Sequence, residues 1–246
     1  MMRLALIGDP VEHSASPTLH RGFLDEAGID GEYVAIRVAR GDGARAIRRL
    51  RADGFTGCNV TYPLKEEAFE VSEVRSDEAR RTQAVNTIFF GREILGTTTD
   101  GAGARTAIET LLDEPVALKR IGVLGYGATA RAVLAALQEN DAYAFVWGRD
   151  AERVSETCRR FEAKAWPDSN PPEIVVSTLP PDVRLPAELA AQLERVDVVI
   201  DANYGSRCML AKQLSREVIP GDAMLEAQAR ASFDFWLAHL DRVAND

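Results

Sequence analysis

Long hydrophobic runs are missing from this chain of 246 residues, whose apolar stretches, such as residues 198–200, have the length of a strand. A membrane-spanning helix needs about 20 consecutive apolar residues, so the sequence predicts no such helix. Residues 1–4 lead directly into a strand-like segment and lack the apolar core and cleavage site of a secretory signal. We therefore expect no signal peptide.

Cysteine is scarce as well. The three cysteines, Cys58, Cys158 and Cys208, lie far apart and show none of the paired spacings that hold a metal ion. Separate thiols of this kind suit a reducing compartment. The sequence accordingly predicts a cytoplasmic protein that carries no metal ion.

Positive charge is in deficit, with 29 lysines and arginines against 38 aspartates and glutamates and a formal net charge of −9. Nucleic-acid binding needs a basic surface, so we expect a small-molecule ligand instead. Arg45, Arg48 and Arg49 recur at helical spacing opposite apolar residues, which predicts a solvated helix face. An anionic ligand must then be held by local cations or by backbone N–H groups.

What the first 100 residues do contain is an alternation of strands and helices. The hydroxyl of Ser16 is placed to cap a helix, with Pro17 at its first position and Gly28 at its end. Further segments are strands at 4–7, 32–38 and 55–60, helices at 42–52 and 65–71, and a hairpin at 85–90 and 93–96. This order predicts a mostly parallel sheet with helical crossovers.

A second series of strand–helix units follows residue 101. Its predicted strands are 121–124, 142–147, 173–178 and 197–201, its helices begin near 102, 131 and 151, and a last long helix covers 222–243. The predicted fold class is therefore α/β with two domains. A mostly parallel substrate-binding domain comprises residues 1–100 and 222–246, and a doubly wound, Rossmann-type nucleotide-binding domain comprises residues 101–221.

The second series opens with the pattern G-x-G-x-x-A at Gly125, Gly127 and Ala130, between a strand and a helix. Gly125 permits a tight turn, Gly127 lets the backbone approach a pyrophosphate, and Ala130 allows close packing of the helix on the sheet. The N-terminus of the helix adds N–H donors and a partial positive charge. The pattern predicts a dinucleotide site formed by Gly125, Tyr126, Gly127, Ala128, Thr129, Arg149 and Thr178.

The choice of dinucleotide depends on the end of the next strand, where Arg149 and Asp150 stand side by side. An arginine there suits the 2′-phosphate of NADP, and a carboxylate there suits the 2′-hydroxyl of NAD. Asp150 could repel the phosphate or simply cap the following helix. We expect NADP, with NAD as the less favoured cofactor.

Polar residues also gather at strand ends and helix starts of the first half. In the segment Asn-Val-Thr-Tyr-Pro-Leu-Lys at 59–65, Lys65 follows a proline by two residues and is either a solvated surface lysine or an ordered proton donor. The heptad alone favours the surface lysine, and the other motifs of the chain favour the proton donor. Four further motifs accompany this segment: His-Ser-Ala-Ser-Pro at 13–17, Ala-Val-Asn-Thr at 84–87, Thr-Asp-Gly at 99–101 and Met-Leu-Glu-Ala-Gln-Ala at 224–229. With these motifs, the sequence resembles the shikimate dehydrogenase family nearly end to end.

That resemblance implies a role for each matching residue. Lys65 and Asp100 form the catalytic pair, with Lys65 as general acid or base. The residues expected to bind the substrate are Ser14, Ser16, Asn59, Thr61, Asn86, Tyr204 and Gln228. The implied reaction is the reversible reduction of the ketone of 3-dehydroshikimate by NADPH, performed by a monomer or a homodimer.

The sequence departs from the family at several positions. Gln83 and Thr98 replace a common glycine and asparagine, residues 204–208 alter a tyrosine-proline segment, and the strand end at 147–150 is unusual. Two alternatives remain open at this point. One is an NAD-dependent quinate/shikimate dehydrogenase, and the other is a non-catalytic nucleotide-binding regulator on the same fold. A hydrolase triad is not expected, because the three histidines are not near a serine–carboxylate set.

Overall fold

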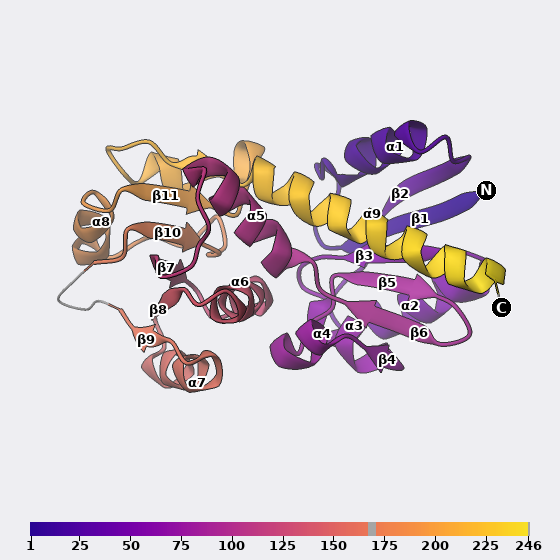
Figure 1. The fold of residues 1–246 in the computed structure, drawn as a ribbon, viewed down its shortest axis with the longest axis horizontal. Coiled ribbons are helices and arrows are strands. Elements are labelled where there is room, and N and C mark those ends of the chain that lie inside the picture. Colours follow the sequence, from indigo (N-terminus) through magenta and orange to yellow (C-terminus); the bar gives the residue numbers. More distant parts are fainter. Residues whose placement is uncertain (167–170, 246) are drawn as a thin grey trace. The chain divides into compact units, whose positions relative to one another are not determined.

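The computed structural model describes residues 1–166 and 171–245, which fold into two compact units (Figure 1). The first unit comprises Met1–Asp100 and Gln228–Asp246, and the second comprises Gly101–Ala227. The first unit is therefore discontinuous in sequence. Its two segments are separated by the whole of the second unit.

The first unit is built on a six-stranded sheet with the order β2-β1-β3-β5-β6-β4. Parallel pairing joins β1 to both β2 and β3, whereas β5 runs antiparallel to β3 and β6. The hairpin predicted near residues 85–96 is the pair β5–β6. The strands are β1 (Met2–Gly8), β2 (Gly31–Arg37), β3 (Gly57–Val60), β4 (Val74–Arg75), β5 (Thr87–Phe90) and β6 (Ile94–Thr97).

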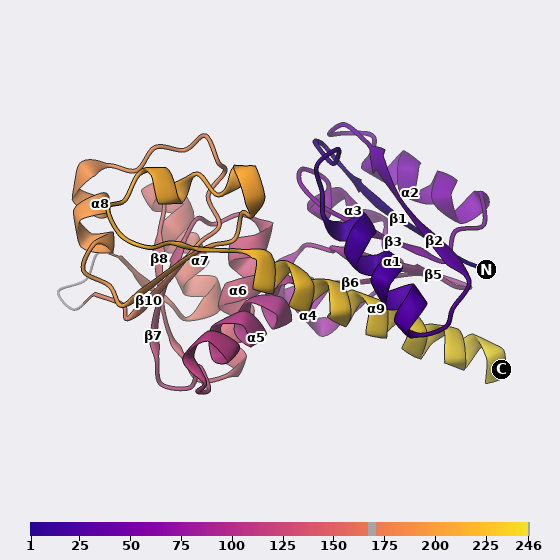
Figure 2. The ribbon, with the colours of Figure 1, turned by 90° about the horizontal axis from the view of Figure 1, so that it is seen from above.

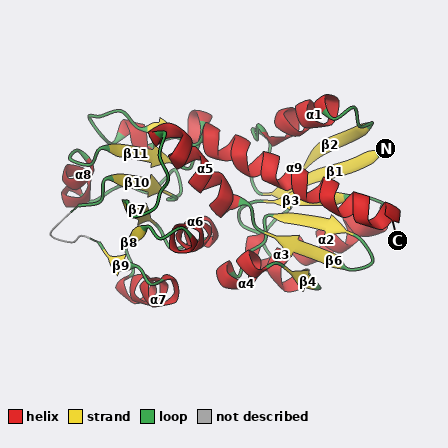
Figure 3. Cartoon of the chain, viewed as in Figure 1, coloured by secondary structure: helices red, strands yellow, loops and turns green. Residues whose placement is uncertain are grey.

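Helices cover both faces of this sheet, because side chains alternate along each strand. Leu4 and Leu6 pack with α1 (Ser16–Glu26) and with α9 (Asp222–Asn245). Ala5 and Ile7 point the other way, into a cluster shared with α2 (Gly43–Ala52) and α3 (Lys65–Val71). In Figure 3 the C-terminal part of α9 crosses the sheet, where the Trp236 indole donates a 2.8 Å hydrogen bond to the backbone oxygen of Ile88.

Some local predictions in this unit are wrong. Ser16 is the first residue of α1 and not its cap: Ala15 occupies the cap position, with helical dihedral angles and no side-chain hydrogen bond. Both β4 and α4 (Asp77–Thr82) were not predicted, because two and six residues are too short to establish a periodicity.

The second unit contains a six-stranded sheet in which every pairing is parallel, with the order β12-β11-β10-β7-β8-β9. This is the doubly wound order that the strand–helix pattern predicted, and the α/β fold class is confirmed. The strand order reverses between β7 and β10. The strands are β7 (Arg120–Leu124), β8 (Tyr143–Trp147), β9 (Lys164–Ala165), β10 (Ile174–Ser177), β11 (Val198–Asp201) and β12 (Ile219–Pro220).

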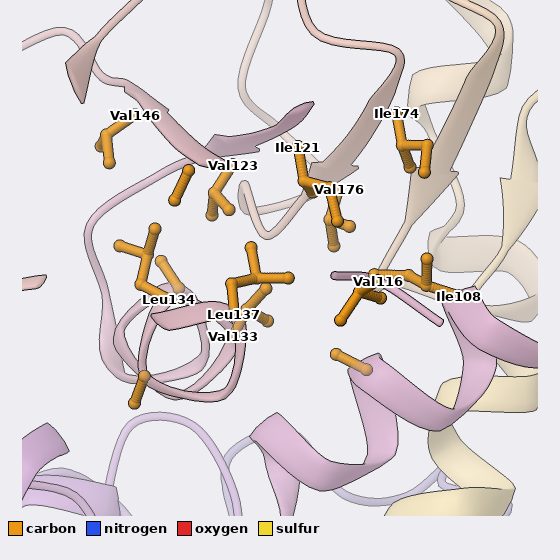
Figure 4. Close-up of a cluster of buried hydrophobic side chains, with 14 of the residues drawn as sticks. Ile108, Val116, Ile121, Val123, Val133, Leu134, Leu137, Val146, Ile174 and Val176 are labelled. Atoms are coloured by element: carbon orange, nitrogen blue, oxygen red, sulfur yellow. The ribbon is translucent and has the colours of Figure 1, made fainter. Parts of the chain in front are cut away.

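Helices lie on both faces of the second sheet. Figure 2 shows α6 (Ala128–Glu139) and α8 (Ala187–Leu193) on opposite sides of the strands. In Figure 4, Val133, Leu134 and Leu137 of α6 point toward Ile121 and Val123 of β7. The remaining helical segments are α5 (Asp100–Leu112), α7 (Ala151–Phe161) and the short turns Gly205–Arg207 and Leu210–Lys212. In the part of the chain that the structure describes, no helix has the length and apolar character needed to cross a bilayer.

Candidate active site

Lys65 and Asp100 form an ion pair in the first unit. Lys65 is the first residue of α3 and Asp100 is the first residue of α5. The ammonium of Lys65 donates to Oδ2 of Asp100, and the two side chains are only 13% and 8% exposed. The structure therefore brings together the two residues predicted to be catalytic, and it holds the lysine in one place instead of leaving it on the surface.

Asn86 holds the other oxygen of this carboxylate. Its Nδ2 donates to Oδ1 of Asp100 at 2.7 Å, and its Oδ1 accepts from the backbone N–H of Thr99 at 2.9 Å. Because a backbone N–H can only donate, the Thr99 contact fixes which end of the amide faces Asp100. The Asn86 side chain is thus oriented as a donor to the carboxylate that pairs with Lys65.

Gln228 reaches the same place from α9. Its Oε1 accepts from Asn86 Nδ2 at 3.3 Å, and its backbone oxygen accepts from the hydroxyl of Thr99 at 3.0 Å. Four residues predicted from separate motifs, Lys65, Asn86, Asp100 and Gln228, are therefore linked by direct hydrogen bonds.

Asn59 lies deeper in the same network. Its Oδ1 accepts from the hydroxyl of Tyr33 at 2.8 Å, and its Nδ2 lies 3.1 Å from the backbone oxygen of Asn86 and 3.1 Å from the hydroxyls of Thr87 and Ser232. The residue is buried. Its amide is occupied by protein groups, which favours a supporting role over the direct substrate contact expected from the sequence.

Beneath this network, His20 is fully buried and stacks on the ring of Tyr33 with centroids 4.4 Å apart. Burial, reinforced by the positive charge of Arg230, lowers the pKa of His20 to about 3. His20 is therefore neutral at physiological pH. Neither His20 nor Tyr33 was assigned a role from the sequence.

Ser14 and Ser16 form a second small cluster. The hydroxyl of Ser14 lies 3.2 Å from that of Ser16 and also accepts from the backbone N–H of Ser16 at 3.2 Å. Ser16 is buried and Ser14 is partly exposed. The two hydroxyls therefore stand side by side at the start of α1, as two neighbouring donors for a carboxylate would.

Thr61 follows β3 and borders the end of β1. Its backbone N–H donates to the oxygen of Ile7 at 2.9 Å, and its methyl group lies where a side chain on Gly8 would be, 2.3 Å from an added Cβ. A glycine is required at position 8 for this approach. The close contact holds Thr61 at the carboxyl edge of the first sheet.

The predicted nucleotide turn lies where the strand order of the second sheet reverses. Gly125 follows β7 with φ +115, and an added Cβ would lie 2.6 Å from Oγ1 of Thr178. Thr178, just after β10, donates its hydroxyl to the backbone oxygen of Leu124 at 2.9 Å. The carboxyl ends of β7 and β10 thus lie side by side where the strand order reverses, the usual ligand position in open α/β sheets.

The helix that follows this turn is well placed to receive an anion. Gly127 is the cap residue of α6, and an added Cβ there would meet no atom within 4 Å. Ala128 and Thr129 form the first turn of α6, while Ala130 is fully buried against the sheet. The backbone N–H groups at this helix end are the donors that a pyrophosphate needs.

Asp150 caps α7, accepting from the backbone N–H groups of Glu152 and Arg153 at 3.0 and 3.1 Å. This geometry favours the capping interpretation of Asp150. Arg149 is exposed beside it. Arg153 was not singled out from the sequence, yet its guanidinium lies over the ring of Tyr126 at 4.3 Å. Arg153 lies in the first turn of α7, close in sequence to Arg149, and this position is the signal by which the sequence could have identified it.

Tyr204 lies in the second unit, just before the turn Gly205–Arg207. Asn203 beside it donates from its side chain to the backbone oxygen of Leu179 at 2.9 Å and to Asp201 at 2.8 Å. These contacts tie the segment after β11 to the segment after β10. The substrate contact expected of Tyr204 stays a prediction.

Comparison with known proteins places this geometry in a family. Residues 6–88 match the family described as the shikimate dehydrogenase substrate binding domain. The shikimate dehydrogenase (NADP(+)) of Aromatoleum aromaticum is 34% identical over 229 residues, which cover 90% of this chain and 76% of that protein. The chain belongs to the shikimate dehydrogenase family. A second family member, from Acidiphilium cryptum, is 42% identical over 161 residues.

The match to that second member covers 65% of this chain and 58% of the Acidiphilium protein, less than two thirds of its length. Among solved structures of the shikimate dehydrogenase family, the enzyme of Thermus thermophilus in complex with NADP(H) and shikimate superposes with a TM-score of 0.83 at 29% identity, covering 96% of this chain and 93% of that one.

Proposed function

We propose that this protein is an NADP-dependent shikimate dehydrogenase, which reversibly reduces the ketone of 3-dehydroshikimate to the alcohol of shikimate. The observation that carries the proposal is the buried Lys65–Asp100 pair, with Asn86 on the second oxygen of the carboxylate. A non-catalytic regulator would have no use for an oriented proton donor. We also propose a cytoplasmic location, which the three free cysteines support.

The residues of the first unit supply the proton chemistry. When a ketone is reduced, its oxygen gains negative charge and must receive a proton. Lys65 donates a hydrogen bond to that oxygen and then the proton, as a general acid. Asp100, held by Asn86, keeps the ammonium of Lys65 in one direction. In the reverse reaction Lys65 accepts the proton.

The first unit, with its segment of α9, is proposed as the substrate domain. Ser14 and Ser16 donate to the substrate carboxylate, because their hydroxyls stand 3.2 Å apart at the start of α1. Thr61, Asn86 and Gln228 contact ring hydroxyls, and Asn59 supports them from below. Tyr204 of the second unit assists at the carboxylate.

The second unit is proposed as the NADP domain, and its residues fit the cofactor. Gly127 leaves open space at the N-terminus of α6, and Gly125 and Thr178 form the turn below it. Arg149 is exposed to pair with a 2′-phosphate, since Asp150 is engaged as the cap of α7. When bound, NADPH supplies the hydride that reaches the carbonyl carbon.

A steady-state comparison tests this proposal. The purified protein is assayed with shikimate and with quinate, each with NADP and with NAD, and the four values of kcat/KM are compared. The proposal requires the highest value for shikimate with NADP. A highest value for quinate with NAD would make the protein a quinate/shikimate dehydrogenase instead, and no turnover with any pair, although nucleotide binds, would make it a regulator.

A further inference from the structure

The hydroxyl of Ser232 on α9 joins the parts of the first unit that hold Asn86. Ser232 is fully buried. Its Oγ lies 2.7 Å from the hydroxyl of Thr87, 3.1 Å from Nδ2 of Asn59 and 3.1 Å from the hydroxyl of Thr99. These three partners come from β5, from β3 and from the segment after β6. The hydroxyl of Ser232 thus connects α9 with all three of them.

The direction of each hydrogen bond follows from the groups that can only donate or only accept. Oδ1 of Asn86 faces the backbone N–H of Thr99, so it is an acceptor. The hydroxyl of Thr87, which lies 2.8 Å from the same oxygen, must then donate its single proton to Oδ1 of Asn86. Nδ2 of Asn86 in turn donates to Asp100.

The hydroxyl proton of Ser232 can be placed in the same way, from the groups around it. Since the proton of Thr87 is committed, the 2.7 Å contact between the two hydroxyls requires Ser232 to donate. Asn59 supplies Ser232 with a hydrogen bond from Nδ2, because its Oδ1 accepts from Tyr33. The backbone oxygen of Gln228 also accepts from Ser232 Oγ at 2.9 Å, so Ser232 shares its proton between Thr87 and Gln228, and the same oxygen accepts from the hydroxyl of Thr99 at 3.0 Å.

The result is a series of hydrogen bonds that all run the same way and end on a carboxylate. We propose that Ser232 is a positioning residue, the central link of a series from Tyr33 through Asn59, Ser232, Thr87 and Asn86 to Asp100, and that this series holds the Asn86 amide in the orientation that directs Asp100 toward Lys65. Hydrogen bonds aligned head to tail polarise one another, so each link strengthens the next. The inference rests on the proposed function, because it assigns Ser232 to the support of that catalytic pair.

A purely structural role for Ser232 is the competing interpretation, and Ser72 offers the matched control. Ser72 is also buried in the first unit, and its hydroxyl donates to the backbone oxygen of Ala68 four residues earlier at 2.7 Å. It has no bond to any member of the series in the part of the chain that the structure describes. Ser72→Ala therefore removes a buried hydroxyl without touching Asn86.

The kinetic experiment compares Ser232→Ala with Ser72→Ala in the parent and in Asn86→Ala. We expect Ser232→Ala to lower kcat about tenfold, with a much smaller change in KM, because one buried hydrogen bond that orients the catalytic pair is lost. In the Asn86→Ala background the same change should have no further effect on kcat. An equal loss of kcat in both backgrounds, or a loss no larger than that of Ser72→Ala, overturns the inference.

A second readout needs no substrate. The side-chain NH₂ signals of Asn86 in a ¹⁵N-labelled protein, assigned by their loss in Asn86→Asp, should shift in Ser232→Ala and stay in place in Ser72→Ala. If the parent protein has no dehydrogenase activity but these signals shift, the proposed function fails and the series stands. If the parent is active but the signals do not move, the series fails alone.

If Ser232→Ala does not fold, Thr87→Val cuts the next link with a side chain of nearly the same shape. The same lowered kcat, the same absence of effect in Asn86→Ala and the same shift of the NH₂ signals are then expected. Unchanged kcat and unchanged signals in Thr87→Val would overturn the inference equally well.

Discussion

Asn86 donates a hydrogen bond of 2.7 Å to Oδ1 of Asp100, and Lys65 pairs with Oδ2 of the same carboxylate. The carboxylate thus has a neutral amide on one oxygen and a cation on the other. Because both oxygens are held, the carboxylate cannot turn freely. The ammonium group of Lys65, which pairs with it, is therefore held in one orientation.

Lys65→Ala should lower kcat by about 10²–10⁴-fold, the usual contribution of a positioned general acid. Substrate affinity should change far less, because the serines at the start of α1 are left intact. Stopped-flow and steady-state rates with NADPH and 3-dehydroshikimate measure both quantities. Lys164→Ala, which removes an exposed lysine of β9, is the control. Near-normal turnover in Lys65→Ala would show that another group supplies the proton.

Substituting the two glycines of the nucleotide turn with alanine should have two different effects, one on stability and one on NADPH binding. Gly125→Ala strains a residue at φ +115 and drives its Cβ toward Thr178, so the melting temperature should fall. Gly127→Ala meets no protein atom, so the melting temperature should hold while the Kd for NADPH rises about tenfold or more, because the methyl group occupies the approach to the pyrophosphate. Calorimetry and fluorescence titration separate the two effects. Unweakened NADPH binding by Gly127→Ala would place the cofactor elsewhere.

Arg149→Ala should change cofactor preference. A guanidinium pairs with a phosphate in a bidentate way, so kcat/KM for NADPH should fall roughly tenfold or more while the value for NADH stays nearly constant. Arg159→Ala, which makes the same change in the last turn of α7, is the matched control. Equal losses with NADPH and NADH would mean that Arg149 does not read the 2′-phosphate.

His20 should make the first unit sensitive to acid. Its pKa is about 3 in the folded protein against 6.5 in the unfolded chain, so the unfolded chain binds more protons between these values. Stability from this residue is therefore complete above pH 6.5 and is lost as the pH falls toward 3, by roughly 3 kcal/mol at pH 4. Urea unfolding at pH 7.5 and pH 4 should show a smaller loss for His20→Phe than for the parent. His13→Phe, at an exposed site, should behave like the parent.

Gln83→Gly should stabilise the protein by up to about 1 kcal/mol. Gln83 ends α4 with φ 52, a left-handed conformation that costs an ordinary residue about 1–2 kcal/mol, more than the added chain entropy of a glycine. The same substitution at Gln138, inside α6, should destabilise by about 1 kcal/mol. Thermal unfolding of both variants makes the comparison, and a lower stability for Gln83→Gly would show that contacts of the Gln83 side chain outweigh the strain.

The conformation of Gln83 also shows why the sequence resembled the family imperfectly at that position. The chain turns at Gln83 with positive φ, a conformation that glycine adopts without strain and that this chain adopts without a glycine. The helix predicted at 65–71 has the same bounds in the structure, and the helix predicted to begin near residue 151 begins at Ala151. Short elements that depend on tertiary pairing, such as β4 and β9, left no periodic signal in the sequence.

The candidate site divides in the same way. Lys65, Asn86, Asp100 and Gln228 were predicted because each lies in a distinctive motif, and the structure links them by hydrogen bonds. Ser232 and Tyr33 were not, because a serine in a helix or a tyrosine in a strand is unremarkable until the strands and α9 bring them together. Thr87 lies in the motif at 84–87, but the sequence assigned it no role of its own. The mutual arrangement of buried polar groups is a property of the folded unit and has no counterpart in local sequence.

The segment of α9 that begins at residue 228 supplies Gln228, Ser232 and Trp236 to a unit whose other segment ends at Asp100. During synthesis, the ribosome makes those 100 residues before the second unit and makes these three residues after it. Domains generally fold as units while the chain is made, so here the later-made second unit is able to finish first. A polypeptide that ended before α9 would contain Lys65 and Asp100, but the position that the Trp236 indole occupies beside Ile88 would be empty. Its first unit would be incompletely folded, and quality-control proteases would degrade it.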